Sequence, residues 1–456
     1  MIKKLKGVKI PQAWVPVVEK VDVLVAGGGP AGLSAAISAA RNGASTLLVE
    51  RTNCLGGMAT SGLVGPFMGT AGTNGGIFRE LINRLKAVGG AKVIKDSTRP
   101  DSDWSFDAEV LKYTNQQMAE EAGVKFLFHT FVEDGLIKNK QLKGVFIANK
   151  GGRQIILADV IIDATGDGDV AAFAGAEFEK GSQKDGHMQA LSLFFRVGGI
   201  DSSLSLPVYQ EVKDTDEPRP NELIKIRKAL EKARKAGEIN LPEQVKHVLM
   251  GWHGSTIRDG EVSVNVDTVT GIDGTDPVQI TVAEIESRKR VWELINFYRK
   301  YVPGYENCFL IDTGSVVGVR ETRRIIGEYV LTKKDVLNAR NFEDGIAKAS
   351  FIVDLHDSGG NPCTSVPKSD WYEIPYRCLV PKGIDNLLVA GRCISSDREA
   401  NGSLRIMATC MATGQAAGTA AALAIQKGLK PRQLEGKFVR GILLAQGADL
   451  ERRRSR

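Results

Sequence analysis

A glycine-rich turn, set between an apolar run and a run of small residues, constrains this chain more than any other feature. Val21–Val25 is short and apolar, and it leads almost directly into Gly27-Gly28-Gly29-Pro30-Ala31-Gly32. In the spacing G-x-G-x-x-G the first glycine permits a tight turn, the second leaves bare backbone beside a pyrophosphate, and the third lets a helix pack closely on a strand. Leu33–Arg41 is the predicted helix, whose N-terminus offers free N–H groups and partial positive charge.

Glu50 stands where a nucleotide-binding β-α-β unit needs an acid. Ser45–Val49 is the next predicted strand, and Glu50 follows it, 18 residues after Gly32. A carboxylate at this distance can accept hydrogen bonds from both hydroxyls of an adenosine ribose. An ordinary glycine turn in an α/β protein would not need that acid. The sequence therefore predicts a dinucleotide-binding unit.

Composition fits a large α/β protein with reduced thiols. The chain has 456 residues, and its 50 glycines are about 11% of the total against an ordinary value of about 7%. Pro11 and Pro16 interrupt the lysine-rich start, so we expect no secretory signal and a cytoplasmic protein. The cysteines form no C-x-x-C pair, which argues against a zinc site, an iron–sulfur cluster or a redox disulfide, and no metal is expected. They are Cys54, Cys308, Cys363, Cys378, Cys393 and Cys410.

The net charge of +6 is concentrated at the two ends of the chain. Residues 1–10 carry +4 and residues 451–456 carry +3, so residues 11–450 sum to −1. Basic tails are usually solvated, and nucleic-acid contact is the less common interpretation. The most membrane-like window, Met407–Ile425, is mostly alanine with polar interruptions. It is too weakly hydrophobic to span a bilayer, and we predict a buried helix there and no membrane span.

The order of predicted elements indicates one discontinuous α/β domain around an inserted second domain. Val124–Ile162 alternates short β-rich runs with glycine turns, which predicts a β-meander, and Asn386–Gly391 returns to an apolar strand. A long helix is predicted near Val282–Tyr301, opened by the capping box Thr281-x-x-Glu284. We assign 18–70, 105–175 and 385–430 to a Rossmann-like domain with a parallel sheet, and 176–384 to an α+β substrate domain. Residues 71–104 are expected to connect or cover the site, with 1–17 and 440–456 as tails.

Four further motifs occur in order along the chain. They are Glu50-Arg51 with Gly56-Gly57-Met58, Asp163-Ala164-Thr165-Gly166-Asp167-Gly168-Asp169, Gly318-Val319-Arg320-Glu321-Thr322-Arg323-Arg324, and Asn386-Leu387-Leu388-Val389-Ala390-Gly391-Arg392-Cys393-Ile394-Ser395. Together with the glycine turn, they resemble the prokaryotic FAD-dependent oxidoreductases. These are similar to the flavoprotein subunits of fumarate reductase and succinate dehydrogenase, within the glutathione-reductase-like superfamily. The resemblance covers roughly residues 20–430 and implies FAD, but says little about the substrate.

The resemblance also implies which residues bind FAD. Glu50 would hold the adenosine ribose, Arg51 would flank the adenine, and Val132 would meet the adenine through its backbone. Near the ribityl chain and the flavin, a helix beginning around Ser403 would stabilise negative charge on the reduced ring. The other residues implied to line the pyrophosphate, the ribityl chain and the flavin are Gly56, Gly57, Thr60, Thr165, Gly166, Asp167, Gly391, Arg392, Gly402 and Leu404.

The route of electrons stays open at this point. No second G-x-G-x-x-G follows a strand later in the chain, and no C-x-x-x-x-C is present. The sequence therefore offers no separate nicotinamide domain. Electrons could pass through the substrate pocket, through a separate partner protein, or to oxygen. A homo-oligomer is compatible with the sequence.

Three residues of the inserted region are candidates for substrate chemistry. Hydride transfer at flavin N5 needs a proton acceptor or donor and a group that holds a polar substrate. His356 lies between Asp354 and Asp357, which could orient its imidazole, and Arg320 could hold an anion. Tyr376 precedes the returning strand, where it could face the flavin. One or two arginines beside Arg320 should form structural ion pairs.

Other histidines and cysteines rank below these candidates. His253, beside Trp252, is the next choice, and His129, His187 and His247 follow. Cys54 and Cys393 flank cofactor motifs, but free cysteine is usually a small buried hydrophobe, so covalent flavin attachment is not expected.

The expected function is hydride transfer between FAD and a small or medium polar or anionic organic molecule, in either direction. His356 would act as general acid or base and Arg320 as an anion clamp. One alternative is an enzyme that uses NAD or resembles thiazole synthase. Another is a flavoprotein that binds RNA through the basic tails.

Overall fold

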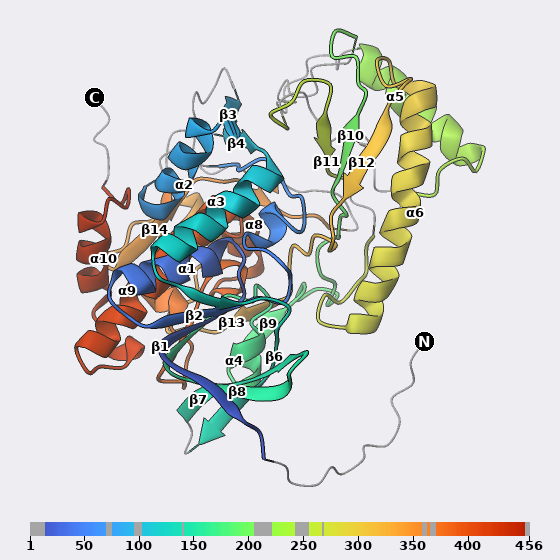
Figure 1. Ribbon diagram of the computed structural model, residues 1–456. Coiled ribbons are helices and arrows are strands. Elements are labelled where there is room, and N and C mark those ends of the chain that lie inside the picture. Colours follow the sequence, from blue (N-terminus) through green and yellow to red (C-terminus); the bar gives the residue numbers. More distant parts are fainter. Residues whose placement is uncertain are drawn as a thin grey trace.

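A computed structural model describes residues 14–69, 75–94, 103–138, 141–204, 221–241, 255–266, 269–357, 363–364 and 371–451. The main sheet has the order β5-β2-β1-β8-β7-β6, and β18 also pairs with β8 (Figure 1). Its strands are β1 (Val17–Ala26), β2 (Thr46–Val49), β5 (Lys125–Leu127), β6 (Phe131–Lys138), β7 (Gln141–Asn149), β8 (Gly152–Asp163) and β18 (Leu387–Val389).

The long strand β8 joins the two halves of this sheet. β5, β2, β1, β8 and β18 run parallel, whereas β6, β7 and β8 form the predicted antiparallel meander. On one edge of β8, residues 152–157 pair with β7 and residues 161–163 pair with β18. The returning segment therefore completes a domain begun at the other end of the chain. The predicted discontinuous Rossmann-like fold is confirmed.

Small residues let two helices pack closely beside the sheet. They are α1 (Pro30–Arg41) and α9 (Met407–Gln426), and nearly all of α9 is buried. A side chain at Gly414 would come within 2.0 Å of the Ala31 carbonyl oxygen, and one at Gly418 within 2.1 Å of the Ala35 oxygen. The predicted buried Ala-rich helix is confirmed. Among the described residues, no helix has the length and apolar character needed to cross a membrane.

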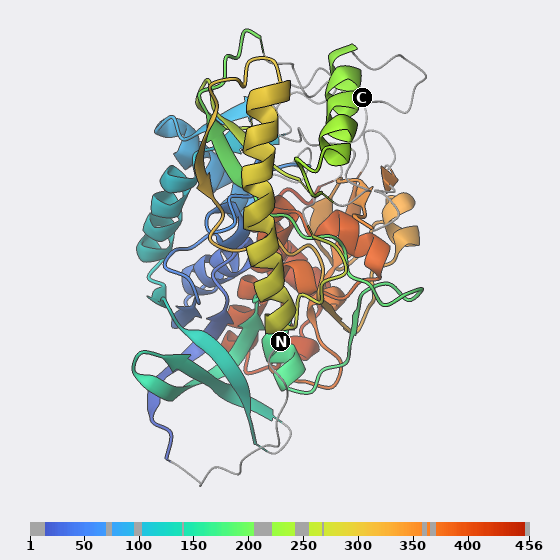
Figure 2. The ribbon, with the colours of Figure 1, turned by 90° about the vertical axis from the view of Figure 1, so that its right-hand side faces the viewer.

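A second hydrophobic cluster lies beside the first and draws on residues 191–319. Its antiparallel sheet has β10 (Phe195–Gly198) between β11 (Val262–Val264) and β12 (Phe309–Thr313). The helices α5 (Asn221–Lys235) and α6 (Pro277–Tyr301) pack with it, and Figure 2 shows α6 along the outer side of this unit. α6 begins four residues before the predicted capping box, because Asp276 accepts the backbone N–H groups of Val278 and Gln279.

The core of the inserted unit draws on residues 191–319, fewer than the predicted domain 176–384. Buried side chains from Ile325 to Ile384 belong to the first cluster, and so do Val439, Leu443 and Leu450 in the segment expected to be a tail. The reason is pairing and packing close to the main sheet: β14 (Gly345–Ala349) pairs with β17 (Tyr372–Pro375), and α10 (Gly436–Ala445) packs against β14.

The remaining elements are short or peripheral. The helices are α2 (Gly76–Ala87), α3 (Ala108–Glu121), α4 (Asp169–Phe173), α7 (Lys333–Leu337) and α8 (Arg398–Leu404). The strands pair as β3 (Ala91–Ile94) with β4 (Asp103–Phe106), β9 (Phe178–Lys180) with β13 (Arg323–Ile325), and β15 (Val353–Asp354) with β16 (Cys363–Thr364).

Candidate functional site

The turn between β1 and α1 has the geometry that its glycines predict. Gly27 has φ +96°, and a side chain there would lie 2.6 Å from the Ala164 oxygen. A side chain at Gly32 would lie 1.8 Å from the Gly27 oxygen. At Gly29, by contrast, a Cβ atom would meet nothing within 4 Å. Gly27 and Gly32 therefore serve the turn itself, whereas Gly29 faces a cavity that it lines together with Pro30 and Ala31.

Glu50 lines the same cavity beside Arg51, and its carboxylate is held in place. Oε2 accepts the Gly28 N–H at 2.6 Å, and Oε1 accepts the N–H and the hydroxyl of Thr52 at 2.7 and 2.8 Å. These hydrogen bonds fix the orientation of the carboxylate. A carboxylate acceptor thus stands at this end of the cavity, next to the turn.

Two loops at the carboxyl edge of the parallel strands form the next part of the wall. Thr165, Gly166 and Asp167 follow β8, and Gly391 and Arg392 follow β18. Arg392 Nη2 lies 2.7 Å from Asp167 Oδ1, whereas Arg392 Nη1 is buried without a hydrogen-bond partner among the described residues. A buried N–H group of a cation without a partner is costly, so this position suits an anionic ligand.

The helix that begins at the cavity is α9 and not one starting near Ser403. Ser403 lies in α8, where its hydroxyl bonds the Phe351 oxygen and the Tyr372 hydroxyl. Gly402, Ser403 and Leu404 are buried and do not line the cavity, because α8 packs against the backbone at Asp354. Met407, in the first turn of the 20-residue helix α9, does line it. That N-terminus supplies partial positive charge.

The other implied cofactor residues differ in their placement. Gly57 lines the cavity, and Gly56, with φ +115°, donates its N–H to the Gly28 oxygen. Thr60 does not line the cavity, since its hydroxyl donates to the Leu55 oxygen and the residue is buried. Val132 lies in β6, packed against the first cluster and outside the cavity wall.

His356 and Arg320 line the far part of this cavity, together with Asp354 and Arg405. His356 Nε2 lies 2.9 Å from Asp354 Oδ2, and Arg405 Nη2 lies 3.3 Å from the same oxygen. Burial by itself would raise the pKa of Asp354, but the bond from His356 and the charge of Arg405 hold that pKa well below its usual range. Asp354 is therefore a carboxylate that orients both a histidine and a guanidinium.

The inserted unit contributes polar groups to the same far part. Arg320 Nη1 donates to the Ala190 oxygen at 2.6 Å, and Nη2 to Asn265 Oδ1 at 3.3 Å. Further lining residues from this side are Ser192, Phe194, Ser255, Ser263 and Asn265. The cavity thus joins the nucleotide-binding turn to a polar, arginine-containing end.

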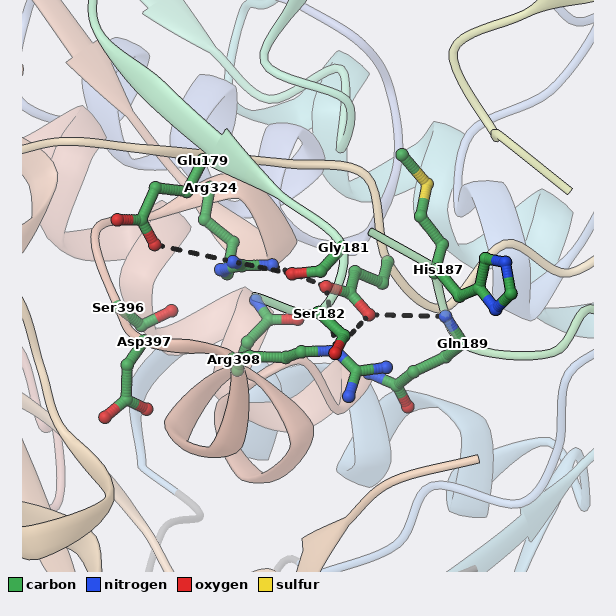
Figure 3. A network of polar contacts seen from close by, with 12 residues as sticks. Glu179, Gly181, Ser182, His187, Gln189, Arg324, Ser396, Asp397 and Arg398 are labelled. Atoms are coloured by element: carbon green, nitrogen blue, oxygen red, sulfur yellow. Dashed lines mark hydrogen bonds and ion pairs between the residues drawn. The ribbon is translucent and has the colours of Figure 1, made fainter. Parts of the chain in front are cut away.

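The neighbours of Arg320 are ion-paired away from the cavity, as predicted. Arg323 pairs with Asp169 at 2.8 Å, and the buried Arg324 pairs with Glu321 at 2.5 Å. Glu321 also receives Arg398, which reaches it from α8 and bonds Asp357 as well. Figure 3 shows Arg324 beside Glu179 and Gly181, with Arg398 on the opposite side of this network. The ion pairs of Arg323, Arg324 and Arg398 therefore hold segments of the fold together.

Tyr376 does not reach the cavity. Its ring is buried in the main core, and its hydroxyl donates to the Pro431 oxygen at 2.8 Å. Tyr376 therefore does not line the cavity that contains His356. His187 is exposed beside Asp185, and His129 occupies a turn with φ +52°. His247 and His253 lie outside the described residues.

The cysteines give no support to covalent attachment. Cys393 is fully buried, its thiol donates to the Ala390 oxygen, and burial raises its pKa well above the usual value. Cys410 lines the cavity, but burial raises its pKa to about 12, so it is a neutral thiol near pH 7. Cys54 contacts Ser61 and does not line the cavity.

Sequence reasoning missed two residues of the far part of the site. The sequence pattern indicates Asp354 only as a neighbour of His356 and gives no role to Arg405. A signal for Arg405 exists: it is a lone charge between the apolar end of α8 and the Ala-rich α9. A single cation in such a stretch needs an anionic partner or a function.

The comparisons with known proteins identify the family. A family model described as FAD dependent oxidoreductase matches residues 22–443. This chain belongs to that family. As an FAD-dependent oxidoreductase it uses FAD, and the open space at Gly29, the fixed carboxylate of Glu50 and the partnerless N–H of Arg392 fit a dinucleotide with a pyrophosphate.

Relatives of this FAD-dependent oxidoreductase resemble only part of it in sequence. The chain is 31% identical over 164 residues to thiamine thiazole synthase from Methanococcus vannielii, covering 34% of this chain and 59% of that protein. The corresponding enzyme of Methanococcus maripaludis is 32% identical over 162 residues, with 34% and 58% covered. The chain thus spans about three fifths of the length of these curated relatives.

Among solved structures, the chain is similar to p-nitrophenol 4-monooxygenase from Pseudomonas putida, with a TM-score of 0.48, 12% identity and coverage of 94% of this chain and 86% of that one. It is also similar to a geranylgeranyl bacteriochlorophyll reductase-like protein from Thermoplasma acidophilum, with a TM-score of 0.47, 12% identity and coverage of 94% and 84%.

Proposed function

We propose that this enzyme transfers hydride between FAD and a small or medium polar or anionic organic substrate. FAD supplies the hydride chemistry when it is bound. One observation carries the proposal: a single cavity is lined at one end by the nucleotide-binding turn and Glu50, and at the other by His356 and Arg320. A proton-transfer group and an anion-binding group thus share the cavity with the residues suited to FAD.

His356 is assigned the proton. Asp354 bonds one ring nitrogen at 2.9 Å, which orients the imidazole and stabilises its protonated form when a proton arrives. Arg320 is assigned the substrate anion, because its guanidinium lines the cavity while two of its nitrogens are anchored by Ala190 and Asn265. Anchoring reduces the entropy lost when the guanidinium binds a carboxylate.

The direction of hydride transfer depends on which substrate the enzyme uses. Reduction of an activated double bond, as in fumarate reductase, and dehydrogenation of a C–H bond use the same two groups in opposite directions. Electrons then enter or leave through a second substrate, a partner protein or oxygen. We also propose that the enzyme is located in the cytoplasm.

The test is an anaerobic screen of the purified holoenzyme. Organic acids, hydroxy acids and alcohols are tested for bleaching of the visible flavin band, and unsaturated acids for reoxidation of the photoreduced enzyme. The screen is repeated with His356→Ala and with His187→Ala, whose imidazole is exposed outside the cavity. We expect a responding substrate whose rate falls only in His356→Ala. Equal rates in both variants, with equal FAD content, would refute the role of His356.

A second candidate is chemistry like that of thiamine thiazole synthase, which the sequence similarity to that enzyme favours. Acid release of an NAD-derived nucleotide in place of FAD from the purified protein would support it. The RNA-binding alternative depends on basic tails, most of which lie outside the described residues. Salt-sensitive RNA binding that disappears after removal of residues 1–10 and 451–456 would support that alternative.

A further inference from the structure

Arg405 is a part-buried cation, with 13% of its side chain exposed and most of its hydrogen-bonding capacity unused. It lines the cavity and precedes the first turn of α9. All its hydrogen bonds to described residues come from Nη2, which reaches Asp354 and Gln189. Nε is buried and has no hydrogen-bond partner among the described residues. A guanidinium has five N–H donors, and a buried donor without an acceptor is costly.

The surroundings of Arg405 are rich in positive charge. Burial, together with the charges of Arg320 and Arg392, lowers its pKa to about 10, although Asp354 and Glu321 oppose this change. Arg405 therefore stays protonated near pH 7. The described carboxylates that line this part of the cavity are Asp354, bonded to Arg405 and His356, and Asp167, bonded to Arg392. Both carboxylates are already bonded to other described residues, so the unused N–H groups of Arg405 suit an anion from outside the protein.

Arg405 and Arg392 have different hydrogen-bond partners. Arg392 sits between the loops that follow β8 and β18 and bonds Asp167 there. Arg405 instead bonds Asp354 and Gln189, the residues that also bond His356. An anion at Arg405 is therefore beside the proton-transfer group.

We propose that Arg405 binds a carboxylate of the substrate, so that the substrate class is organic acids. This inference rests on the proposed function, because it places the carboxylate next to His356. Asp354 accepts from Nη2 and thereby aligns the guanidinium, while the remaining N–H groups donate to the substrate carboxylate. Arg320 then contacts a second polar group or the other face of the same acid.

The experiment measures binding and not turnover. Wild-type holoenzyme is titrated with propionate, succinate and benzoate and with the matching amides, using the flavin difference spectrum and the shift in melting temperature as independent readouts. The same titrations use Arg405→Gln, Arg405→Lys and the control Arg196→Gln. Arg196 is a part-buried arginine paired with Asp312 outside the cavity.

We expect at least one acid to bind the wild type at least about 10-fold more tightly than its amide. Arg405→Gln should weaken the acid by about 10- to 100-fold and leave the amide and the FAD content unchanged, because charge-assisted hydrogen bonds of this size are lost. Arg405→Lys keeps a charge beside Asp354 and should bind the acid about 10-fold more weakly than the wild type. This variant provides the test if Arg405→Gln does not fold. Arg196→Gln should bind like the wild type.

Several outcomes would overturn the inference. An unchanged ratio of acid to amide affinity in Arg405→Gln and Arg405→Lys would show that Arg405 only neutralises Asp354. Loss of FAD in both variants would assign it to the cofactor. If the wild type binds no acid but neutral substrates still bleach the flavin in a His356-dependent way, the carboxylate assignment fails and the proposed function stands. Absence of any substrate-dependent flavin reduction or reoxidation would instead refute the proposed function.

Discussion

We expect Gly29→Val to abolish FAD binding while leaving the fold of the apoprotein intact. Gly29 has φ −67° and ψ −175°, a backbone conformation that any residue adopts, and its Cβ position is empty to 4 Å. Gly29 is the N-cap of α1, and valine is a poor N-cap, so the apoprotein should lose at most about 1 kcal/mol. The valine side chain would fill the space assigned to the pyrophosphate.

The expected loss of affinity follows from the contacts that the pyrophosphate would make. Two or three charge-assisted hydrogen bonds to backbone N–H groups contribute about 1.5–3 kcal/mol each. Their loss weakens FAD binding by about 3–9 kcal/mol, or by about 10²- to 10⁶-fold. Gly32→Val is the matched comparison, because its Cβ would lie 1.8 Å from the Gly27 oxygen and must displace α1 from β1. We expect it to destabilise even the apoprotein, by about 3 kcal/mol or more.

The assay has two measurements on each variant. Urea unfolding of the apoprotein gives the free energy of unfolding, and calorimetric titration with FAD gives the dissociation constant. Gly29→Val should unfold like the wild type and fail to bind FAD, whereas Gly32→Val should unfold more easily. Full FAD occupancy in Gly29→Val would refute the assignment of the turn. Equal destabilisation of the two apoproteins would refute the reasoning about which glycine serves the fold.

Four further predictions follow from the site. His356→Ala should keep FAD and lose about 10²- to 10⁴-fold in single-turnover flavin reduction or reoxidation by the substrate, and Asn at this position should not restore the rate if His356 moves a proton. Arg320→Ala should act on the substrate dissociation constant, by about 2–5 kcal/mol if it pairs with a desolvated anion. NADH and NADPH should reduce the flavin slowly, because no second G-x-G-x-x-G follows a strand, and rapid saturable bleaching would reveal a nicotinamide site. Burial raises the pKa of Asp163 to about 6, so the native state binds a proton that the unfolded state has released between about pH 4 and 6. The wild type should therefore lose up to about 3 kcal/mol over that range as pH rises, and Asp163→Asn, measured by urea unfolding, should lack this component.

Local patterns in the sequence were sufficient for the cofactor-binding part of the fold. Gly27, Gly29 and Gly32 act within one turn, and Glu50 follows the next strand, so spacing along the chain translates directly into geometry. The β-meander was equally readable, because alternating apolar runs and glycine turns pair neighbouring strands. The Ala-rich α9 was recognisable from composition for the same reason.

Only the tertiary structure decided which polar residues share the cavity. Arg320 lines it while Arg324, four residues on, is buried against Glu321, because β13 pairs with β9 at that point. Tyr376 was misplaced because α10 and the segment before it cover the ring, a contact between parts of the chain that no local pattern reveals. Arg405 meets Asp354 across about 50 residues of sequence, a pairing that depends on long-range packing. Spacing along a chain determines geometry only within a turn or a strand pair, whereas contacts between distant segments depend on how the whole core packs.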